Sequence, residues 1–116
     1  IMPSLVGSEM CIRDSIYTAG VTANDPETQK MVAPGDIIGQ TEQIMKNMQA
    51  ILEEAGSDLA HIIKTMVFVK DIEDFAKFNE AYKKFFPNNP PARSTMQVGN
   101  FLGDMVIEIE AIATEK

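Results

Sequence analysis

Residues 62–69 read Ile-Ile-Lys-Thr-Met-Val-Phe-Val, and this run of β-branched and apolar side chains predicts a strand. Its two alternating faces are Ile63, Thr65, Val67 and Val69 on one side, and Ile62, Lys64, Met66 and Phe68 on the other. Apolar side chains on both faces are typical of a central strand that is covered on both sides. We therefore expect this stretch to lie inside a sheet.

Two helices are predicted, one on each side of this strand along the chain. Asp36 is a favourable N-cap for the first helix, and Gly56 is a favourable stop. Its apolar face comprises Ile38, Thr41, Ile44, Met45, Met48, Ile51, Leu52 and Ala55. The second helix begins at Asp71 or Asp74 and ends before Pro87, with an aromatic face of Phe75, Phe78, Tyr82 and Phe85. Because each helix has a single apolar face, each is expected to pack on the sheet.

Further strands are predicted over residues 15–20, 93–98 and 105–113, so the order of elements is strand, helix, strand, helix, strand, strand. Right-handed crossovers would place both helices on the same face of the sheet, giving an α+β fold. The opposite face would stay open, although apolar side chains lie on it or near it: Met66, Phe68, Val106 and Ile112. An open apolar face predicts self-association.

Composition narrows the classes of function. The chain has 116 residues, enough for one domain, and a formal net charge of −7 with scattered lysines, which disfavours nucleic-acid binding. With Cys11 as the single cysteine and His61 as the single histidine, the sequence offers no internal disulfide and no zinc site. No apolar run reaches the length of a membrane helix, and no signal peptide is visible. A cytoplasmic location is expected.

Residues 1–14 lack a clear helix or strand pattern and look like a translated adapter from DNA library preparation. We therefore expect a non-native tail at residues 1–14 and one domain over residues 15–116. In the alternative interpretation, residues 9–12 form an ordinary strand of a hairpin that turns at Arg13-Asp14.

Three polar features are candidates for chemistry. Arg93 follows a proline-stiffened loop at the start of a strand, where a guanidinium can form a two-pronged bond to a carboxylate. Glu108 and Glu110 share one strand face beside apolar neighbours, an arrangement that can raise a carboxyl pKa for acid–base work. Asn79 interrupts the aromatic face of the second helix. The alternatives are a structural surface arginine, solvated glutamates or a glutamate paired with Lys64, and a solvent-facing asparagine.

Several ordered segments resemble the RidA/YjgF family. They are Pro90-Pro91-Ala92-Arg93-Ser94-Thr95, the ending Ile107-Glu108-Ile109-Glu110-Ala111-Ile112-Ala113, and the stretches 47–56, 63–71 and 74–86. The resemblance runs from about residue 15 to residue 114 without a large gap. It implies a chorismate-mutase-like (YjgF-type) fold, with two helices on one face of the sheet and the other face in a trimer interface. Active sites would lie in clefts between subunits.

The resemblance also implies an activity: cofactor-free hydrolysis of enamines and imines, such as 2-aminoacrylate and 2-iminobutanoate, to 2-keto acids and ammonia. In that frame Arg93 holds the substrate carboxylate and Glu108 activates water, with no metal. Other cleft positions would be Gly20, Asn79, Thr95 and Ala19. Ala19 departs from the serine common in the family, and Val6 falls near the place of a cleft tyrosine.

Two other functions compete with the deaminase. A non-enzymatic ligand-binding or chaperone-like member of the superfamily would keep the fold, but the presence of both Arg93 and Glu108 favours the enzyme. A chorismate-mutase-type isomerase would need more cationic groups than the sequence supplies. RNA binding, described for some relatives, is disfavoured by the acidic charge.

Overall fold

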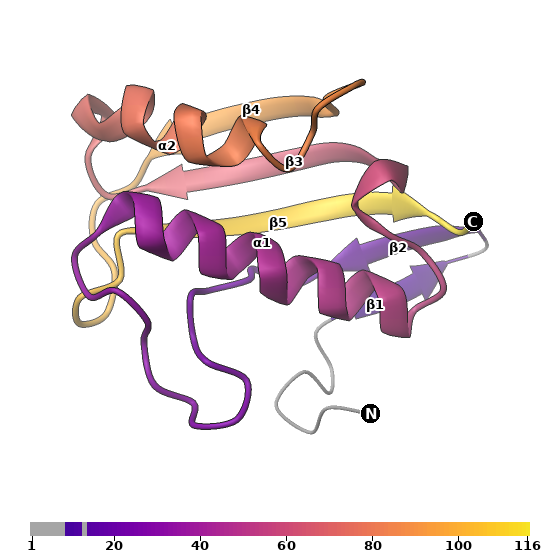
Figure 1. Cartoon of the computed structure of the whole chain (residues 1–116), viewed down its shortest axis with the longest axis horizontal. Helices are drawn as coiled ribbons and strands as arrows, with labels where there is room; N and C mark the ends of the chain where they lie inside the picture. Colours follow the sequence, from indigo (N-terminus) through magenta and orange to yellow (C-terminus); the bar gives the residue numbers. More distant parts are fainter. Residues whose placement is uncertain (1–8, 13) are drawn as a thin grey trace.

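The computed structural model describes residues 9–12 and 14–116, which form one sheet with two helices on one of its faces (Figure 1). The elements in chain order are β1 (Glu9–Ile12), β2 (Ser15–Thr18), α1 (Ile37–Glu54), the 3-10 helix η2 (Leu59–His61), β3 (Ile62–Val69), the 3-10 helix η3 (Ile72–Asp74), α2 (Phe75–Lys83), β4 (Ala92–Gln97) and β5 (Ile107–Thr114). The predicted order and type of the elements from residue 15 onward are confirmed. Within the described ranges, no helix is both long and apolar enough to cross a membrane.

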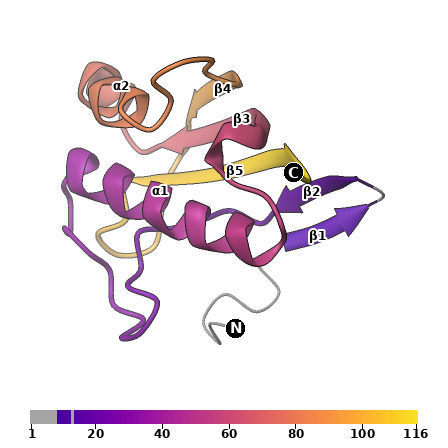
Figure 2. The same ribbon diagram turned by 45° about the vertical axis from the view of Figure 1, so that its right-hand side comes forward.

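The sheet has the order β1-β2-β5-β3-β4. β3 pairs with β5 antiparallel and with β4 parallel, so the strand at 62–69 is internal, as predicted. Both helices lie on the same face, which the turned view also shows (Figure 2). The helices therefore cover only one of the two faces that we expected to be covered. On the other face Met66 and Phe68 are half-buried.

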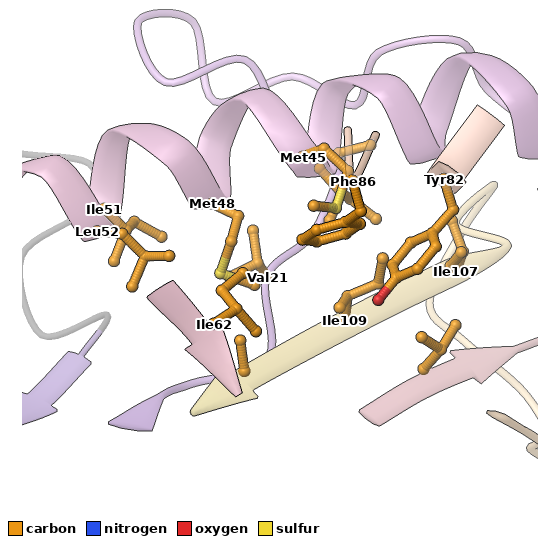
Figure 3. Packing of buried hydrophobic residues seen from close by; sticks show 14 of the residues in the cluster. Val21, Met45, Met48, Ile51, Leu52, Ile62, Tyr82, Phe86, Ile107 and Ile109 are labelled. Carbon is orange, nitrogen blue, oxygen red and sulfur yellow. The ribbon is translucent and has the colours of Figure 1, made fainter. Parts of the chain in front are cut away.

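The buried core lies between the helices and the sheet (Figure 3). α1 contributes Met45, Met48, Ile51 and Leu52, α2 contributes Tyr82 and the segment after it Phe86, and β5 contributes Ile107 and Ile109. This burial is the main stabilising term for a chain of this size.

The first helix begins and ends as its sequence indicates. The side chain of Asp36 accepts a hydrogen bond from the backbone N–H of Ile38, and Gly56 follows the helix with a φ of 86°, a conformation that glycine adopts at little cost. One member of the predicted apolar face was wrong: Ile38 is 40% exposed, and Ile37 is buried instead. The buried face also includes Gln40 and Asn47, two polar residues that the apolar pattern could not identify.

The second helix also departs from expectation in detail. Asp71 caps the short η3 helix by accepting from the backbone N–H of Glu73, and α2 follows from Phe75. The predicted face is right for Phe78 and Tyr82, but Phe86 rather than Phe85 is the buried residue beyond them. The reason is that the helix stops at Lys83, so the helical spacing no longer sets the direction of the side chains that follow.

The predicted faces of β3 were wrong at Ile62 and Ile63, because a β-bulge lies at the start of the strand. The register with β5 shifts between Ile62 and Lys64. The extra residue reverses the alternation at this point. Ile62 is consequently buried with Thr65, Val67 and Val69, while Ile63 is 52% exposed.

β1 pairs antiparallel with β2, with Ile12 opposite Ser15, which is the hairpin of the alternative interpretation. Pairing of this kind depends on the backbone and does not bear on the origin of the residues. The foreign origin of residues 1–14 therefore stays a prediction, and Val6 lies outside the described residues.

Gln40 ties α1 to the loops at its end of the sheet. Its amide is fully buried and donates to the carbonyls of Ala33 and Asp104, at 3.1 and 2.9 Å, while its Oε1 accepts from the backbone N–H of Val106 at 2.9 Å. One side chain therefore satisfies two backbone groups just before β5 and one just before α1, which links the start of α1 to the segment that leads into β5.

We predict that Gln40→Ala lowers the free energy of unfolding by roughly 3 kcal/mol, because it leaves buried backbone groups without partners. Urea unfolding measures this change. Gln49→Ala is the control, since the Gln49 side chain is exposed and donates to the exposed carboxylate of Glu53 within the same helix. Equal, small effects of the two substitutions would contradict this role of Gln40.

Candidate functional site

Arg93 lies on the edge strand β4, on the face that the helices cover. It stands opposite Thr65 in the parallel β3–β4 register. Its guanidinium carbon lies 5.3, 5.3 and 5.0 Å from the ring centroids of Phe75, Phe78 and Tyr82, and its Nη1 donates to Asn79 Oδ1 at 2.8 Å. The predicted pair of Arg93 and Asn79 is therefore brought together, and Asn79 points toward the arginine rather than into solvent.

The charge of Arg93 is not balanced by any described acidic residue, because no carboxylate among residues 9–12 and 14–116 lies within 4.0 Å of its nitrogens. This is notable in a chain with 17 acidic residues. The guanidinium borders a cleft of about 390 Å³ lined by Asn79, Tyr82, Lys83, Phe86, Pro90, Pro91 and Arg93. A half-buried, uncompensated guanidinium beside a cleft is suited to bind an anion such as a carboxylate.

Glu108 lies on the opposite face of the sheet. It stands opposite Phe68 in the β3–β5 register and alternates along β5 with Ile107 and Ile109, which point into the core. Burial raises the pKa of Glu108, and the neighbouring charge of Glu110 raises it further. A carboxyl group with a raised pKa holds a proton more readily than an ordinary glutamate, which suits it to general acid–base work.

Gly20 lies directly beside Glu108. A Cβ atom placed on Gly20 would lie 2.6 Å from the carboxyl carbon of Glu108, so a side chain at this position would force the carboxylate to move. Gly20 follows β2 after Ala19, and both residues are exposed. The structure thus brings together two of the predicted site residues, Gly20 and Glu108, at the open face.

The predicted residues form two groups rather than one. Arg93 and Asn79 lie at the edge of the helix-covered face, and Thr95, opposite Val67, shares that face of β4. Glu108 and Gly20 lie on the open face. Because a sheet separates the two groups, one chain does not bring Arg93 and Glu108 to the same reactant.

The alternative in which a glutamate pairs with Lys64 can be resolved. Lys64 donates to Ser94 Oγ at 2.9 Å, and neither Glu108 nor Glu110 forms an ion pair with any described residue. The side chain of Asp58 caps η2 by accepting from the backbone N–H of His61 at 3.1 Å, and its Oδ1 also lies 2.6 Å from His61 Nδ1, so His61 has a structural role here. Across the described part of the chain, no group of three or more His, Cys, Asp or Glu side chains is placed to hold a metal ion.

The aromatic surroundings of Arg93 were missed from sequence. The stripe of Phe75, Phe78 and Tyr82 was interpreted only as a packing face, yet the same rings surround the guanidinium. The hydroxyl of Tyr82 also bonds to that of Thr65 at 2.7 Å, inside the core. A tyrosine in an otherwise phenylalanine stripe was the one signal that pointed to this contact.

Comparison with known proteins identifies the family and the fold. A family model described as endoribonuclease L-PSP matches residues 6–115. A RutC family protein of Pyrococcus abyssi is 46% identical over 98 residues, which cover 84% of this chain and 76% of the relative. The crystal structure of the YjgF gene product of E. coli superposes with a TM-score of 0.88 at 38% identity, covering 98% of this chain and 93% of that one. The chain belongs to the RidA/YjgF family.

Membership confirms the predicted YjgF-type α+β fold. Two further RidA/YjgF relatives carry names that bear on function. Reactive Intermediate Deaminase A of Arabidopsis thaliana, a chloroplastic protein, is 43% identical over 99 residues, covering 85% of this chain and 52% of the relative. The structure of E. coli TdcF, solved with bound serine, has a TM-score of 0.85 at 35% identity and covers 94% of this chain and 87% of that one. The family thus includes a deaminase of reactive intermediates.

We predict that the carboxyl group of Glu108 titrates above the range of an ordinary glutamate, and that Glu110→Gln lowers its pKa because one of the two causes of the shift is removed. Burial remains in that variant, so the pKa should fall only part of the way. Carboxyl-detected NMR titration measures it. Glu53→Gln, on the exposed surface of α1, should leave the titration of Glu108 unchanged, and an equal shift in both variants would contradict the local origin of the effect.

Proposed function

We propose that this protein hydrolyses reactive enamine and imine carboxylates, such as 2-aminoacrylate and 2-iminobutanoate, to 2-keto acids and ammonia. The observation that carries the proposal is the half-buried Arg93 guanidinium, which borders a cleft and has no described carboxylate partner. The deaminase name of the Arabidopsis relative supports the reaction. The serine bound to TdcF supports a ligand with a carboxylate in this family.

The proposed site is completed by two subunits. Arg93 and Asn79 at the edge strand of one subunit would face Glu108 and Gly20 on the open sheet face of its neighbour, in a homotrimer with clefts between subunits. The half-buried apolar side chains of the open face, such as Met66 and Phe68, support a covered position for that face. Thr95 and Ala19 are proposed to line the same cleft.

The proposed reaction begins when the substrate carboxylate forms a two-pronged bond with Arg93. A water molecule then attacks the electrophilic iminium carbon while Glu108 accepts one of its protons, which gives a neutral carbinolamine. Glu108 returns the proton to the nitrogen, and the C–N bond then breaks as the hydroxyl group gives its proton to Glu108. Glu108 passes that proton to the departing ammonia, so the products are a 2-keto acid and ammonium, and Glu108 is again a carboxylate. The raised pKa of Glu108 suits both transfers, because it makes the carboxylate a stronger base than an ordinary glutamate while the protonated form can still return the proton. The iminium carbon is itself electrophilic, so no cofactor is invoked.

A ligand-binding role without catalysis is the second candidate, since the anion site around Arg93 would serve it equally well. Cleavage of RNA, which the family description names, is disfavoured by the net charge of −7. A carboxyl group with a raised pKa at the open face favours the enzyme over the binder.

The test is a coupled assay in which the purified protein is added to a threonine dehydratase reaction and the imine is trapped with semicarbazide. We expect the wild-type chain to speed imine decay. Arg93→Ala should lower kcat/KM by roughly 100-fold or more, because losing the group that holds a charged substrate costs about 3 kcal/mol.

Lys77→Ala is the control for that assay, because it removes an exposed positive charge from α2. It should leave the rate unchanged. Full activity in Arg93→Ala would refute the assigned role of the arginine, and carboxylate binding without imine hydrolysis by the wild-type chain would favour the ligand-binding role.

A further inference from the structure

Arg93 is held in place from two directions. A guanidinium on a long flexible side chain gives specific two-pronged binding only if its plane is fixed before the ligand arrives. Here Asn79 holds Nη1, and three rings of α2 lie around the guanidinium carbon. These rings can fix the guanidinium only if their own positions are fixed.

The rings form a ladder along one side of α2 and beyond its end. Successive ring centroids of Phe75, Phe78, Tyr82 and Phe86 are 6.1, 5.1 and 4.9 Å apart. Tyr82 is the only member with a hydroxyl group, and its ring is the nearest of the three to the Arg93 guanidinium carbon, at 5.0 Å. Packing alone does not require that hydroxyl, because phenylalanine fills the other positions.

The hydroxyl of Tyr82 bonds to a residue that also sets the backbone of Arg93. Its partner is Thr65 Oγ1, at 2.7 Å, and both residues are almost completely buried, with exposures of 3% for Tyr82 and 0% for Thr65. Thr65 in turn stands opposite Arg93 in the register between β3 and β4. The contacts therefore form a closed circuit from Arg93 to Thr65 through the sheet, from Thr65 to Tyr82 through hydroxyls, and from Tyr82 back to the guanidinium through its ring.

A buried hydroxyl pair is costly unless each group is satisfied, so the pair confines the Tyr82 ring to one position relative to β3. Burial raises the pKa of Tyr82, which keeps its hydroxyl protonated and able to take part in the bond. A phenylalanine ring at the same place would be held by packing alone, without the bond that ties it to β3, and the guanidinium beside it would be less firmly fixed in its plane.

We propose that the Thr65–Tyr82 hydroxyl pair is a positioning device that fixes the plane of the Arg93 guanidinium for carboxylate binding. This inference rests on the proposed function insofar as Arg93 is taken to bind a carboxylate. Thr65 and Tyr82 act through Arg93 and are positioning residues, not catalytic ones.

The experiment removes the hydroxyls while keeping the shapes of the side chains. Tyr82→Phe, Thr65→Val and the double variant are compared with wild type for binding of 2-oxobutanoate by calorimetry. We expect each single variant to raise the dissociation constant by roughly 5- to 10-fold, because the guanidinium is no longer held in its binding geometry. The double variant should bind no more weakly than either single variant, because both substitutions break the same bond.

Two controls separate positioning from stability. Thr65→Ser retains the hydroxyl, so this variant should bind 2-oxobutanoate with nearly the wild-type dissociation constant. Thr41→Val removes a hydroxyl that is equally buried, with 0% exposure, but that bonds to the carbonyl of Ile37 within α1. It should lower stability in urea as Thr65→Val does, yet leave the dissociation constant unchanged.

A second readout reports on the arginine itself. In wild type the Arg93 Nε–H should give a distinct NMR signal with slow rotation about the Nε–Cζ bond, and in Tyr82→Phe the rotation should be faster. Unchanged 2-oxobutanoate binding and unchanged Arg93 dynamics in both hydroxyl variants would overturn the inference, as would a wild-type chain that does not bind 2-oxobutanoate.

The proposed function is judged separately, by imine hydrolysis in the wild-type chain. If the wild-type chain hydrolyses the imine and the hydroxyl variants bind 2-oxobutanoate as tightly as wild type, the inference is refuted and the deaminase function is supported. Arg93-dependent binding weakened in the hydroxyl variants, without any hydrolysis, would support the inference and refute the deaminase.

Discussion

The alternation of side chains along β-strands is the constraint on which the organisation of this protein depends. Both helices pack on one face of the sheet, so every strand residue is committed either to that face or to the open one. Arg93 falls on the first face and Glu108 on the second. A single chain therefore holds the two principal candidates for chemistry on opposite sides of a sheet, and the proposed deaminase requires a second copy to bring them together.

α2 and β5 each contribute residues both to the buried core and to the candidate site. The stripe of α2 that buries Phe78 and Tyr82 against the sheet also surrounds the guanidinium of Arg93, and Asn79 of the same helix accepts its hydrogen bond. On the other face, the residues of β5 that flank Glu108 are core residues, and Gly20 leaves room for its carboxylate. Stability and the geometry of the site are consequently difficult to change independently.

Much of this could be predicted from the sequence, because helix caps, apolar spacing and strand composition are local signals. They identified the order of the elements from residue 15 onward and the caps of α1, and the family resemblance identified the fold. Details that depend on pairing between distant segments could not be predicted. The bulge that buries Ile62 and exposes Ile63 is visible only in the register with β5, and Phe86 replaces Phe85 in the core because the helix stops early. The opposite placement of Arg93 and Glu108 also follows from register, since alternation within separate strands does not relate one strand to another.

The most direct test of the two-subunit site mixes chains that carry complementary defects. Arg93→Ala and Glu108→Gln chains with different affinity tags are co-expressed, trimers containing both are isolated, and native mass spectrometry confirms their composition. Each variant alone should be inactive in the imine assay. In a mixed trimer only one of the three clefts pairs an intact Arg93 with an intact Glu108, so activity should return to roughly one third of wild type. Confirmed mixed trimers that stay inactive, or failure of the chains to associate at all, would contradict the account.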